Sequence, residues 1–314
     1  MFRGNESHDE HYMVQYGVWS NCCNNCDFCL RLWRIPLPKE DMLHQLDNIK
    51  KNIEYVDWEG KFSYGISLLG GELYFVTDEE IQQSYLELVD IIIDKILLKS
   101  PNPNVKYSTV TNGLYDPTFL FKVVDKIVEK VGIRAVDVNF SYDLKYRFKT
   151  KEAEQLCLDN INKFHQRYDN YSVGIQMILT QYVIDMVKSG EFNITDFINK
   201  NVPGNLITFL YPHPINTGLV LPDFNFRRKD FLDFMLMLKE KEPEVYNNFY
   251  MSTHNSAIFK YTGLFDKNSD DVTQQPVLSD GKEVINPVCG HSKLYQCYSD
   301  SDKCIVCDLE TLEA

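Results

Sequence analysis

The feature that most constrains the fold of this chain is an alternation of short β-rich runs with longer segments of helical period. The runs predict six strands, at residues 12–19, 63–69, 105–110, 135–140, 173–179 and 206–210. Helical segments separate these runs, so the pattern predicts βα units and a parallel sheet. Such units curl into a full or partial barrel, and ligands bind at the carboxyl ends of its strands.

Apolar residues at helical spacing predict the helices between these strands. The first two stripes comprise Met42, Leu46, Ile49, Ile53 and Val56, and then Ile81, Tyr85, Leu88, Ile92 and Ile96. Thr77 and Glu80 have the spacing of a capping box for the second helix. Asp116 and Pro117 are expected to cap and begin a third helix, which ends before Gly132. A last helix is predicted at about 226–240.

Charge and hydropathy exclude some classes of protein. Lys plus Arg is 32 and Asp plus Glu is 45, so the net charge is 32 − 45 = −13, which disfavours general binding to nucleic acids. A local basic pocket remains compatible with a nucleotide. The first twelve residues lack the pattern of a secretory signal, and no apolar run reaches the ~20 residues that span a bilayer. We therefore expect a soluble, cytoplasmic protein with no membrane partner.

The nine cysteines lie mostly at the two ends of the chain, which favours metal or cluster ligation over a disulfide framework. The two groups are Cys22, Cys23, Cys26 and Cys29, and then Cys289, Cys297, Cys304 and Cys307. Cys157 is isolated, and its helical spacing from Ile161 and Phe164 predicts an inert thiol in the core.

Three cysteines of the first group form the pattern C-x3-C-x2-C on the loop after the first strand. They are Cys22, Cys26 and Cys29, with the aromatic Phe28 just before the last. Three thiolates on one tight loop hold three irons of a 4Fe-4S cluster and leave the fourth iron open to a substrate or cofactor.

Two other metal sites compete for the first group. A ferredoxin pattern that begins at Cys23 fails, because Trp33 and Arg34 stand where a cysteine and a proline are required. A structural zinc ion bound by all four cysteines stays possible, although adjacent Cys22 and Cys23 fit a tetrahedral shell poorly.

With these residues in view, the chain resembles the radical S-adenosylmethionine (SAM) enzymes over about residues 12–218. Gly70-Gly71-Glu72 is similar to the GGE signature of that family, and Thr111-Asn112-Gly113 to its TNG turn. Residues 139–143 are similar to the segment that closes the family's fourth strand, and Pro212-His213-Pro214 falls where its sixth strand ends. The order and spacing of these segments carry the resemblance.

The resemblance implies an α/β fold, a partial (β/α)6 barrel over residues 1–218 followed by a cysteine-rich extension over 219–314. It also implies that SAM binds the open iron and is cleaved to a 5′-deoxyadenosyl radical, which abstracts a hydrogen atom from the substrate. Gly70 and Gly71 would let backbone approach the methionine moiety, and Glu72 would accept a hydrogen bond from its ammonium group. The alternative for this segment is a plain turn with an exposed carboxylate.

Four further residues complete the predicted cofactor site. Asn112 lies in the TNG turn, and Ser141 and Asp143 would bind the ribose hydroxyls of SAM. A capping cluster before the next helix is an equal alternative for Ser141 and Asp143. Phe28 would shield the cluster or flank adenine, although aromatic residues near strand ends often simply pack.

The second cysteine group has the spacings x7, x6 and x2, and four thiolates complete either a zinc shell or a fully ligated cluster. These residues, Cys289, Cys297, Cys304 and Cys307, resemble part of a SPASM/twitch-like auxiliary-cluster extension, although its longer cysteine pattern is absent. The resemblance therefore favours one second 4Fe-4S cluster, with zinc as the alternative.

The leading functional hypothesis is a radical SAM enzyme that acts on a peptide or protein side chain and is reduced by a flavodoxin or ferredoxin. A nucleotide or another small metabolite is the alternative substrate. A hypothesis of a different class is a non-enzymatic Fe-S electron carrier or a metal-stabilised binding module, which would explain the cysteines but not the GGE and TNG segments.

Overall fold

The computed structural model describes residues 13–26, 28–29, 36–55, 65–100, 103, 105–210 and 228–246. The predicted segment Pro212-His213-Pro214 and the second cysteine group, Cys289, Cys297, Cys304 and Cys307, lie outside these residues. The described chain forms two compact units. One lies within Glu10–Gln176 with Lys200–Leu206, and the other within Met177–Asn199 and the described residues from Ile207 onward.

A six-stranded parallel sheet organises the described chain and confirms the predicted α/β class. Its strands are β1 (Met13–Gly17), β2 (Gly65–Leu69), β3 (Lys106–Thr111), β4 (Val136–Ser141), β5 (Gly174–Ile178) and β6 (Leu206–Leu210). Each strand overlaps its predicted range. The strand order follows the chain order, β1 to β6, and the sheet is open, with β1 and β6 at its edges.

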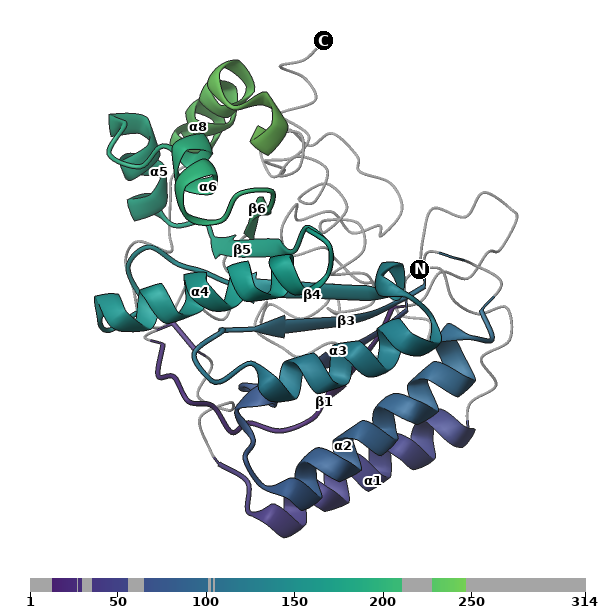
Figure 1. Ribbon diagram of the computed structural model, residues 1–314. Helices are drawn as coiled ribbons and strands as arrows, with labels where there is room; N and C mark the ends of the chain where they lie inside the picture. Colours follow the sequence, from purple (N-terminus) through teal and green to yellow (C-terminus); the bar gives the residue numbers. More distant parts are fainter. Residues whose placement is uncertain are drawn as a thin grey trace, which may run out of the picture. The chain divides into compact units, whose positions relative to one another are not determined.

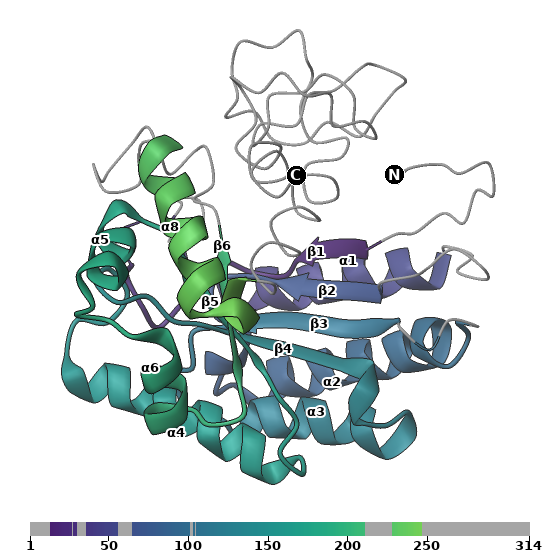
Figure 2. The same cartoon turned by 90° about the horizontal axis from the view of Figure 1, so that it is seen from above.

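Helices connect the strands in the expected alternation. They are α1 (Lys39–Tyr55), α2 (Glu79–Ile92), α3 (Thr118–Lys130), α4 (Lys151–Arg167), α5 (Gln181–Ser189), α6 (Ile194–Asn201) and α8 (Arg228–Lys241). Three short helical turns, η2 (Leu73–Phe75), η3 (Ile93–Leu97) and η4 (Ile133–Ala135), join longer elements. In both views α1, α2 and α3 lie on one side of strands β1–β4 (Figures 1 and 2). Sequential parallel strands with helices on one side form a singly wound sheet.

The predicted apolar stripes form the core between these helices and the sheet. The buried residues are Met42, Leu46, Ile49 and Ile53 of α1, and Ile81, Tyr85, Leu88, Ile92 and Ile96 of α2 and η3. Val56, the last residue predicted for the first stripe, lies outside the described residues. Opposite the helices, strand residues such as Ile66 and Leu68 are fully buried. Apolar burial on both sides of the interface is what holds helices on such a sheet.

Two predicted helix starts differ in detail from the structure. The N-cap of α2 is Asp78 rather than Thr77, because the Asp78 carboxylate accepts hydrogen bonds from the backbone N–H groups of Glu80 and Ile81. The carboxylate accepts more strongly than a threonine hydroxyl, and it sits one residue closer to the helix. At α3, the N-cap is Pro117 rather than Asp116, and the helix begins one residue later than predicted, at Thr118. The Asp116 side chain still accepts a hydrogen bond from the Thr118 N–H at 2.8 Å.

A buried tyrosine cluster links the sheet to η2. The hydroxyl of Tyr107 on β3 lies 2.9 Å from that of Tyr74 on η2 and 2.8 Å from that of Tyr85 on α2. All three side chains are buried, so each hydroxyl finds its partner inside the protein, as buried polar groups must. The cluster fixes η2, and with it the turn that precedes η2 in the chain.

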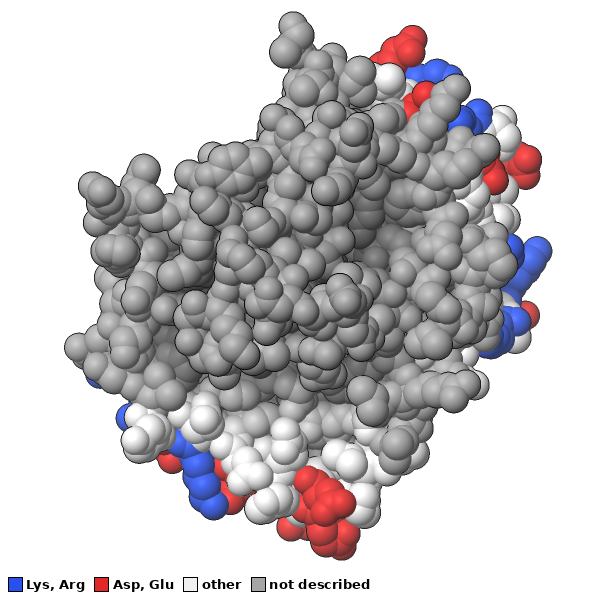
Figure 3. Space-filling view, turned by 180° about the vertical axis from the view of Figure 1, so that it is seen from behind, with Lys and Arg blue, Asp and Glu red and all other residues white. Residues whose placement is uncertain are grey.

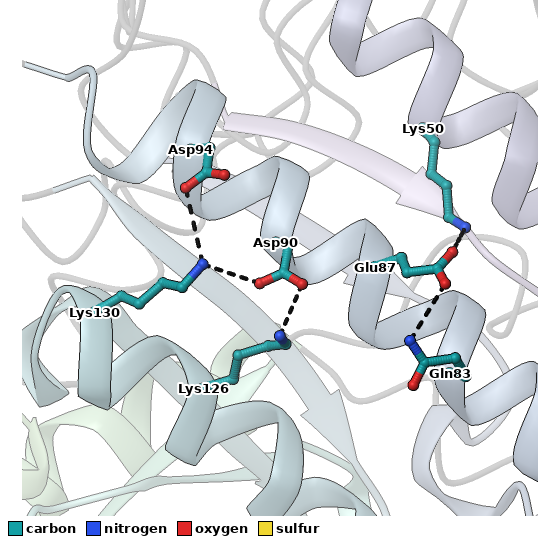
Figure 4. A network of polar contacts seen from close by, with 7 residues as sticks. All are labelled: Lys50, Gln83, Glu87, Asp90, Asp94, Lys126 and Lys130. Atoms are coloured by element: carbon teal, nitrogen blue, oxygen red, sulfur yellow. Dashed lines mark hydrogen bonds and ion pairs between the residues drawn. The ribbon is translucent and has the colours of Figure 1, made fainter.

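Ion pairs join neighbouring helices on their outer side (Figure 4). Lys50 of α1 contacts Glu87 of α2 at 2.8 Å, and Asp90 of α2 contacts Lys126 and Lys130 of α3 at 2.7 and 3.1 Å. Exposed pairs of this kind contribute about 0–1 kcal/mol each. The buried stripes therefore supply most of the stabilisation between these helices.

In the other unit, α5 contacts α8, and Phe209 packs edge-on against Phe234 of α8 with ring centroids 5.6 Å apart.

None of the helices in the described part of the chain is long and apolar enough to cross a bilayer. Where Figure 3 shows described residues, acidic and basic side chains are intermingled rather than separated into fields of one sign.

Candidate functional site

The carboxyl ends of β1 to β4 lie side by side, because these strands are parallel and paired in register. The predicted site segments each follow one of these strands: the cysteine loop follows β1, Gly70-Gly71-Glu72 follows β2, Asn112 follows β3, and Asp143 follows β4. All four belong to one compact unit. The topology therefore brings together segments that are about 120 residues apart in the sequence.

The GGE segment is bonded directly to the start of the cysteine loop. The Gly71 N–H donates to the Trp19 carbonyl and the Glu72 N–H to the Asn21 carbonyl, both at 2.8 Å. A Cβ atom on Gly71 would lie only 2.4 Å from the Asn21 oxygen and 2.5 Å from the Ser20 oxygen. Glycine is thus required here by the close passage of the backbone that leads to Cys22. The predicted approach of a methionine moiety to these glycines stays a prediction.

The carboxylate of Glu72 is buried and connects two strand ends. One of its oxygens, Oε2, accepts from the Asn112 N–H at 2.6 Å, and the other, Oε1, accepts from the Thr111 hydroxyl at 2.9 Å. The side chain is only 1% exposed. The alternative of a plain turn with an exposed carboxylate is therefore wrong. Glu72 ties the turn after β3 to the segment after β2, and its predicted contact with an ammonium group stays a prediction.

Burial raises the pKa of Glu72 to about 8, and the hydrogen bonds from Asn112 and Thr111 act in the opposite direction. The charge of the nearby Cys22 thiolate raises the pKa further. A carboxyl group in such a position titrates near neutral pH, several units above its ordinary value.

Asn112 contacts the cysteine loop with its side chain. Its Nδ2 donates to the sulfur atoms of Cys22 and Cys23, at 3.6 and 3.5 Å, while its Oδ1 accepts from the Leu114 N–H at 2.8 Å. The Leu114 bond is the local turn that Asn favours, and it holds the amide in place. Asn112 was predicted to lie in the cofactor site, and its amide contacts the cysteine sulfurs.

The two adjacent cysteines differ in their proton affinity. The Cys23 thiol hydrogen-bonds to Cys22 and lowers the pKa of Cys22 to about 6, while the same contact and burial raise the pKa of Cys23. For Cys26, burial raises the pKa to about 11, although the guanidinium of Arg147 pulls it down. A thiolate is the form that binds metal, and Cys22 loses its proton more readily than Cys23 or Cys26.

Asn24 links two of the predicted ligands. Its backbone N–H donates to the Cys22 sulfur at 3.4 Å, and its Nδ2 donates to the Cys26 sulfur at 3.2 Å. Asn24 is not among the residues predicted for the site. Its position between two cysteines of the motif is the only sequence signal that points to it.

Asp143 and Arg147 form a buried ion pair beside Cys26. Arg147 Nε donates to Asp143 Oδ2 at 2.7 Å, and Arg147 Nη1 donates to the Cys26 sulfur at 3.7 Å. The guanidinium lies over the ring of Phe28, 5.2 Å from its centroid.

The capping alternative for Ser141 and Asp143 is wrong, because α4 begins at Lys151 and its N-cap is Thr150, whose side chain accepts from the Ala153 N–H.

Arg147 belongs to none of the motifs in the sequence, although its i, i+4 spacing from Asp143 directly after a strand is a usable signal. Ser141, the last residue of β4, is half-buried and pairs in register with Gln176 of β5. The predicted contacts of Ser141 and Asp143 with a ribose stay predictions.

A buried asparagine supports the turn after β3 from behind. Asn160 of α4 is 1% exposed, and its Nδ2 donates to the carbonyls of Gly113 and Tyr115 at 2.9 and 2.8 Å. Cys157, one turn earlier on α4, lies against Gly113 and is fully buried, and burial raises its pKa to about 12. The predicted place of this thiol in the core is thus confirmed, while the role of Asn160 was not visible in the sequence.

Within the described residues, no group of three or more His, Cys, Asp or Glu side chains is arranged around a single metal position. This finding concerns one ion, as in the zinc alternative, whose ligands converge at about 2.0–2.3 Å. An iron-sulfur cluster binds each cysteine to a different iron, so its ligand sulfurs do not converge on one point. The donor chemistry of Cys22, Cys26 and Cys29, with N–H donors directed at two of these sulfurs, fits such a cluster.

Comparison with known proteins identifies no relative on which the site could be interpreted. No protein-family model matches this chain, and no curated protein matches it. Among solved structures, the apo form of 3-keto-D-glucoside 4-epimerase from E. coli is similar, with a TM-score of 0.31 and 11% sequence identity over 72% of this chain and 88% of that chain. So weak a likeness carries no information about activity.

The buried carboxyl group of Glu72 predicts a pH-dependent stability that a Glu72→Gln variant lacks. The folded pKa of about 8 lies above the ordinary 4.5, so its contribution is complete below about pH 4.5 and is lost as pH rises through about 8. Glutamine resembles the protonated form, since its carbonyl accepts from Asn112 and its amide can donate to Thr111. We expect the two proteins to unfold alike near pH 5 and the variant to be more stable by a few kcal/mol near pH 9.

Denaturant unfolding of the iron-free, reduced protein between these pH values measures the difference. Glu54→Gln, a change at an exposed position of α1, is the control and should leave the pH dependence unchanged. Parallel curves for wild type and Glu72→Gln would show that Glu72 titrates normally.

Proposed function

We propose that this protein is a radical SAM enzyme whose sheet is the partial (β/α)6 barrel of that family. The observation that carries the proposal is the set of contacts between four strand ends: the backbone bonds from Gly71 and Glu72 to the cysteine loop, the Asn112 amide on Cys22, and Arg147 on Cys26. The motifs were identified separately in the sequence. Their direct contact supports one shared site rather than four coincidental turns.

The proposed cofactors are a 4Fe-4S cluster, bound by Cys22, Cys26 and Cys29, and SAM. When bound, such a cluster supplies the electron that cleaves SAM to a 5′-deoxyadenosyl radical. Three protein ligands leave one iron open, which an electron carrier does not need. A non-enzymatic carrier or a metal-stabilised binding module would explain the cysteines but not the GGE and TNG segments. Both observations favour the enzyme.

The residues of the site have distinct tasks in this proposal. Asn24 and Asn112 donate N–H groups to the ligand sulfurs and thereby orient them. Glu72 holds the turn that carries Asn112, and Asn160 supports that turn from α4. Ser141 and Asp143 are positioned after β4, where we propose that they bind ribose hydroxyls.

For the substrate, a peptide or protein side chain remains our first proposal, and a nucleotide or other small metabolite the alternative. The proposal rests on the second cysteine group, Cys289, Cys297, Cys304 and Cys307, which we propose to bind a second 4Fe-4S cluster or, alternatively, zinc. A flavodoxin or ferredoxin is the proposed reductant.

The direct test of the proposed function is the cleavage of SAM. Anaerobically reconstituted protein, reduced with dithionite and incubated with SAM, should release 5′-deoxyadenosine, measured by liquid chromatography with mass detection. Protein without reconstituted iron is the control and should release none. If the fully reconstituted, reduced protein forms no 5′-deoxyadenosine with SAM, the carrier or binding-module hypothesis replaces the enzyme.

A second prediction concerns which cysteines bind the cluster. Alanine replacement of Cys22, Cys26 or Cys29 should abolish the visible charge-transfer absorption of thiolate-bound iron, because each variant leaves an iron without its ligand. Cys23→Ala is the matched control, since Cys23 is adjacent to a ligand and contacts the same Asn112 amide. An equal loss of absorption in Cys23→Ala would contradict the assignment, because it would make Cys23 a cluster ligand as well.

A further inference from the structure

Arg147 is a buried cation placed against a predicted cluster ligand. Its side chain is 11% exposed, and its Nη1 group points to the Cys26 sulfur at 3.7 Å. Cys26 itself is 6% exposed, so water screens this contact little. Neither the cysteine motif nor the GGE and TNG segments include Arg147.

The guanidinium is held in a fixed orientation from several sides. Its Nε is bound to Asp143, its plane lies over the Phe28 ring, and its own backbone carbonyl accepts from Asn24 Nδ2 at 3.0 Å. The same Asn24 amide donates to Cys26. The carboxylate of Asp143 is bound at Nε, while Nη1 faces the sulfur. The pair therefore presents a positive donor to Cys26 and keeps its negative charge on another side of the guanidinium.

We propose that Arg147 and Asp143 form a charge pair that sets the reduction potential of the cluster bound through Cys26, with Arg147 raising the potential and Asp143 lowering it. The inference rests on the proposed function, because it requires a cluster at Cys22, Cys26 and Cys29. Arg147 is in this proposal a positioning residue, because it acts through a ligand sulfur and not on the substrate.

The physical reason is the change in charge on reduction. A cluster gains one negative charge when it accepts an electron, and part of that charge resides on its thiolate sulfurs. A hydrogen-bond donor and a positive charge at a sulfur stabilise the reduced state and raise the potential, whereas a nearby carboxylate destabilises it. Low exposure of both residues strengthens the two effects, which have opposite signs.

The test is the midpoint potential of the reconstituted cluster, measured by anaerobic redox titration of the full chain. Arg147→Gln should lower the potential, and Asp143→Asn, which keeps the arginine, should raise it. The double variant should return toward the wild-type value, because both charges are removed. A purely structural role for this pair would not predict shifts of opposite sign.

The chain offers a matched control in Arg167. This residue also pairs with an aspartate, Asp125, at 2.7 Å and lies over an aromatic ring, that of Phe121, at 4.9 Å, but its side chain is 47% exposed. Among the described residues, its hydrogen bonds and ion pairs join it to Asp125 and to no cysteine. Arg167→Gln should leave the potential unchanged.

The outcomes separate this inference from the proposed function. If wild type binds no cluster, the proposed function fails and the inference with it. If wild type and variants bind the cluster with one common potential, the inference fails while the proposed function stands. If Arg147→Gln loses the cluster, Asp143→Asn decides: a raised potential supports the inference, and an unchanged one overturns it.

Discussion

The site depends on one buried carboxyl group, that of Glu72, which is bonded to the end of a neighbouring strand where water is largely excluded. Its oxygens accept from the Asn112 N–H and the Thr111 hydroxyl, and its own N–H donates to Asn21 of the cysteine loop. Removal of a partner from such a group leaves a buried polar atom unsatisfied, which costs about 1–3 kcal/mol. The three strand ends of β1, β2 and β3 are therefore fixed relative to one another before any cofactor binds.

This constraint explains why the remaining features occur where they do. Because Glu72 holds the turn after β3, the Asn112 amide faces Cys22 and Cys23. Because the loop after β1 passes so close to Gly71, that position accepts no side chain. The tyrosine cluster of Tyr74, Tyr85 and Tyr107 then fixes η2, the element that directly follows Glu72. These local bonds meet because the sheet is parallel and sequentially ordered, which places the carboxyl ends of its strands side by side.

Much of the fold was predictable from the sequence, because strand and helix periods report directly on burial. The stripe from Ile81 to Ile96 and all six strands are where periodicity placed them. The motif residues were identifiable, but their partners were not. Asn24, Arg147 and Asn160 act through hydrogen bonds whose geometry depends on loop conformation and on contacts between distant segments. The burial of Glu72 was likewise invisible, since a glutamate after two glycines is typical of an exposed turn.

The central claim is that three cysteines on this loop hold a 4Fe-4S cluster with one iron open to SAM. Electron paramagnetic resonance of the dithionite-reduced, reconstituted protein tests it most directly, with spectra recorded before and after SAM is added. Coordination of SAM to the open iron predicts a clear change in the g values of the reduced cluster. A cluster signal that SAM leaves unchanged, in protein with full iron content, would contradict the account.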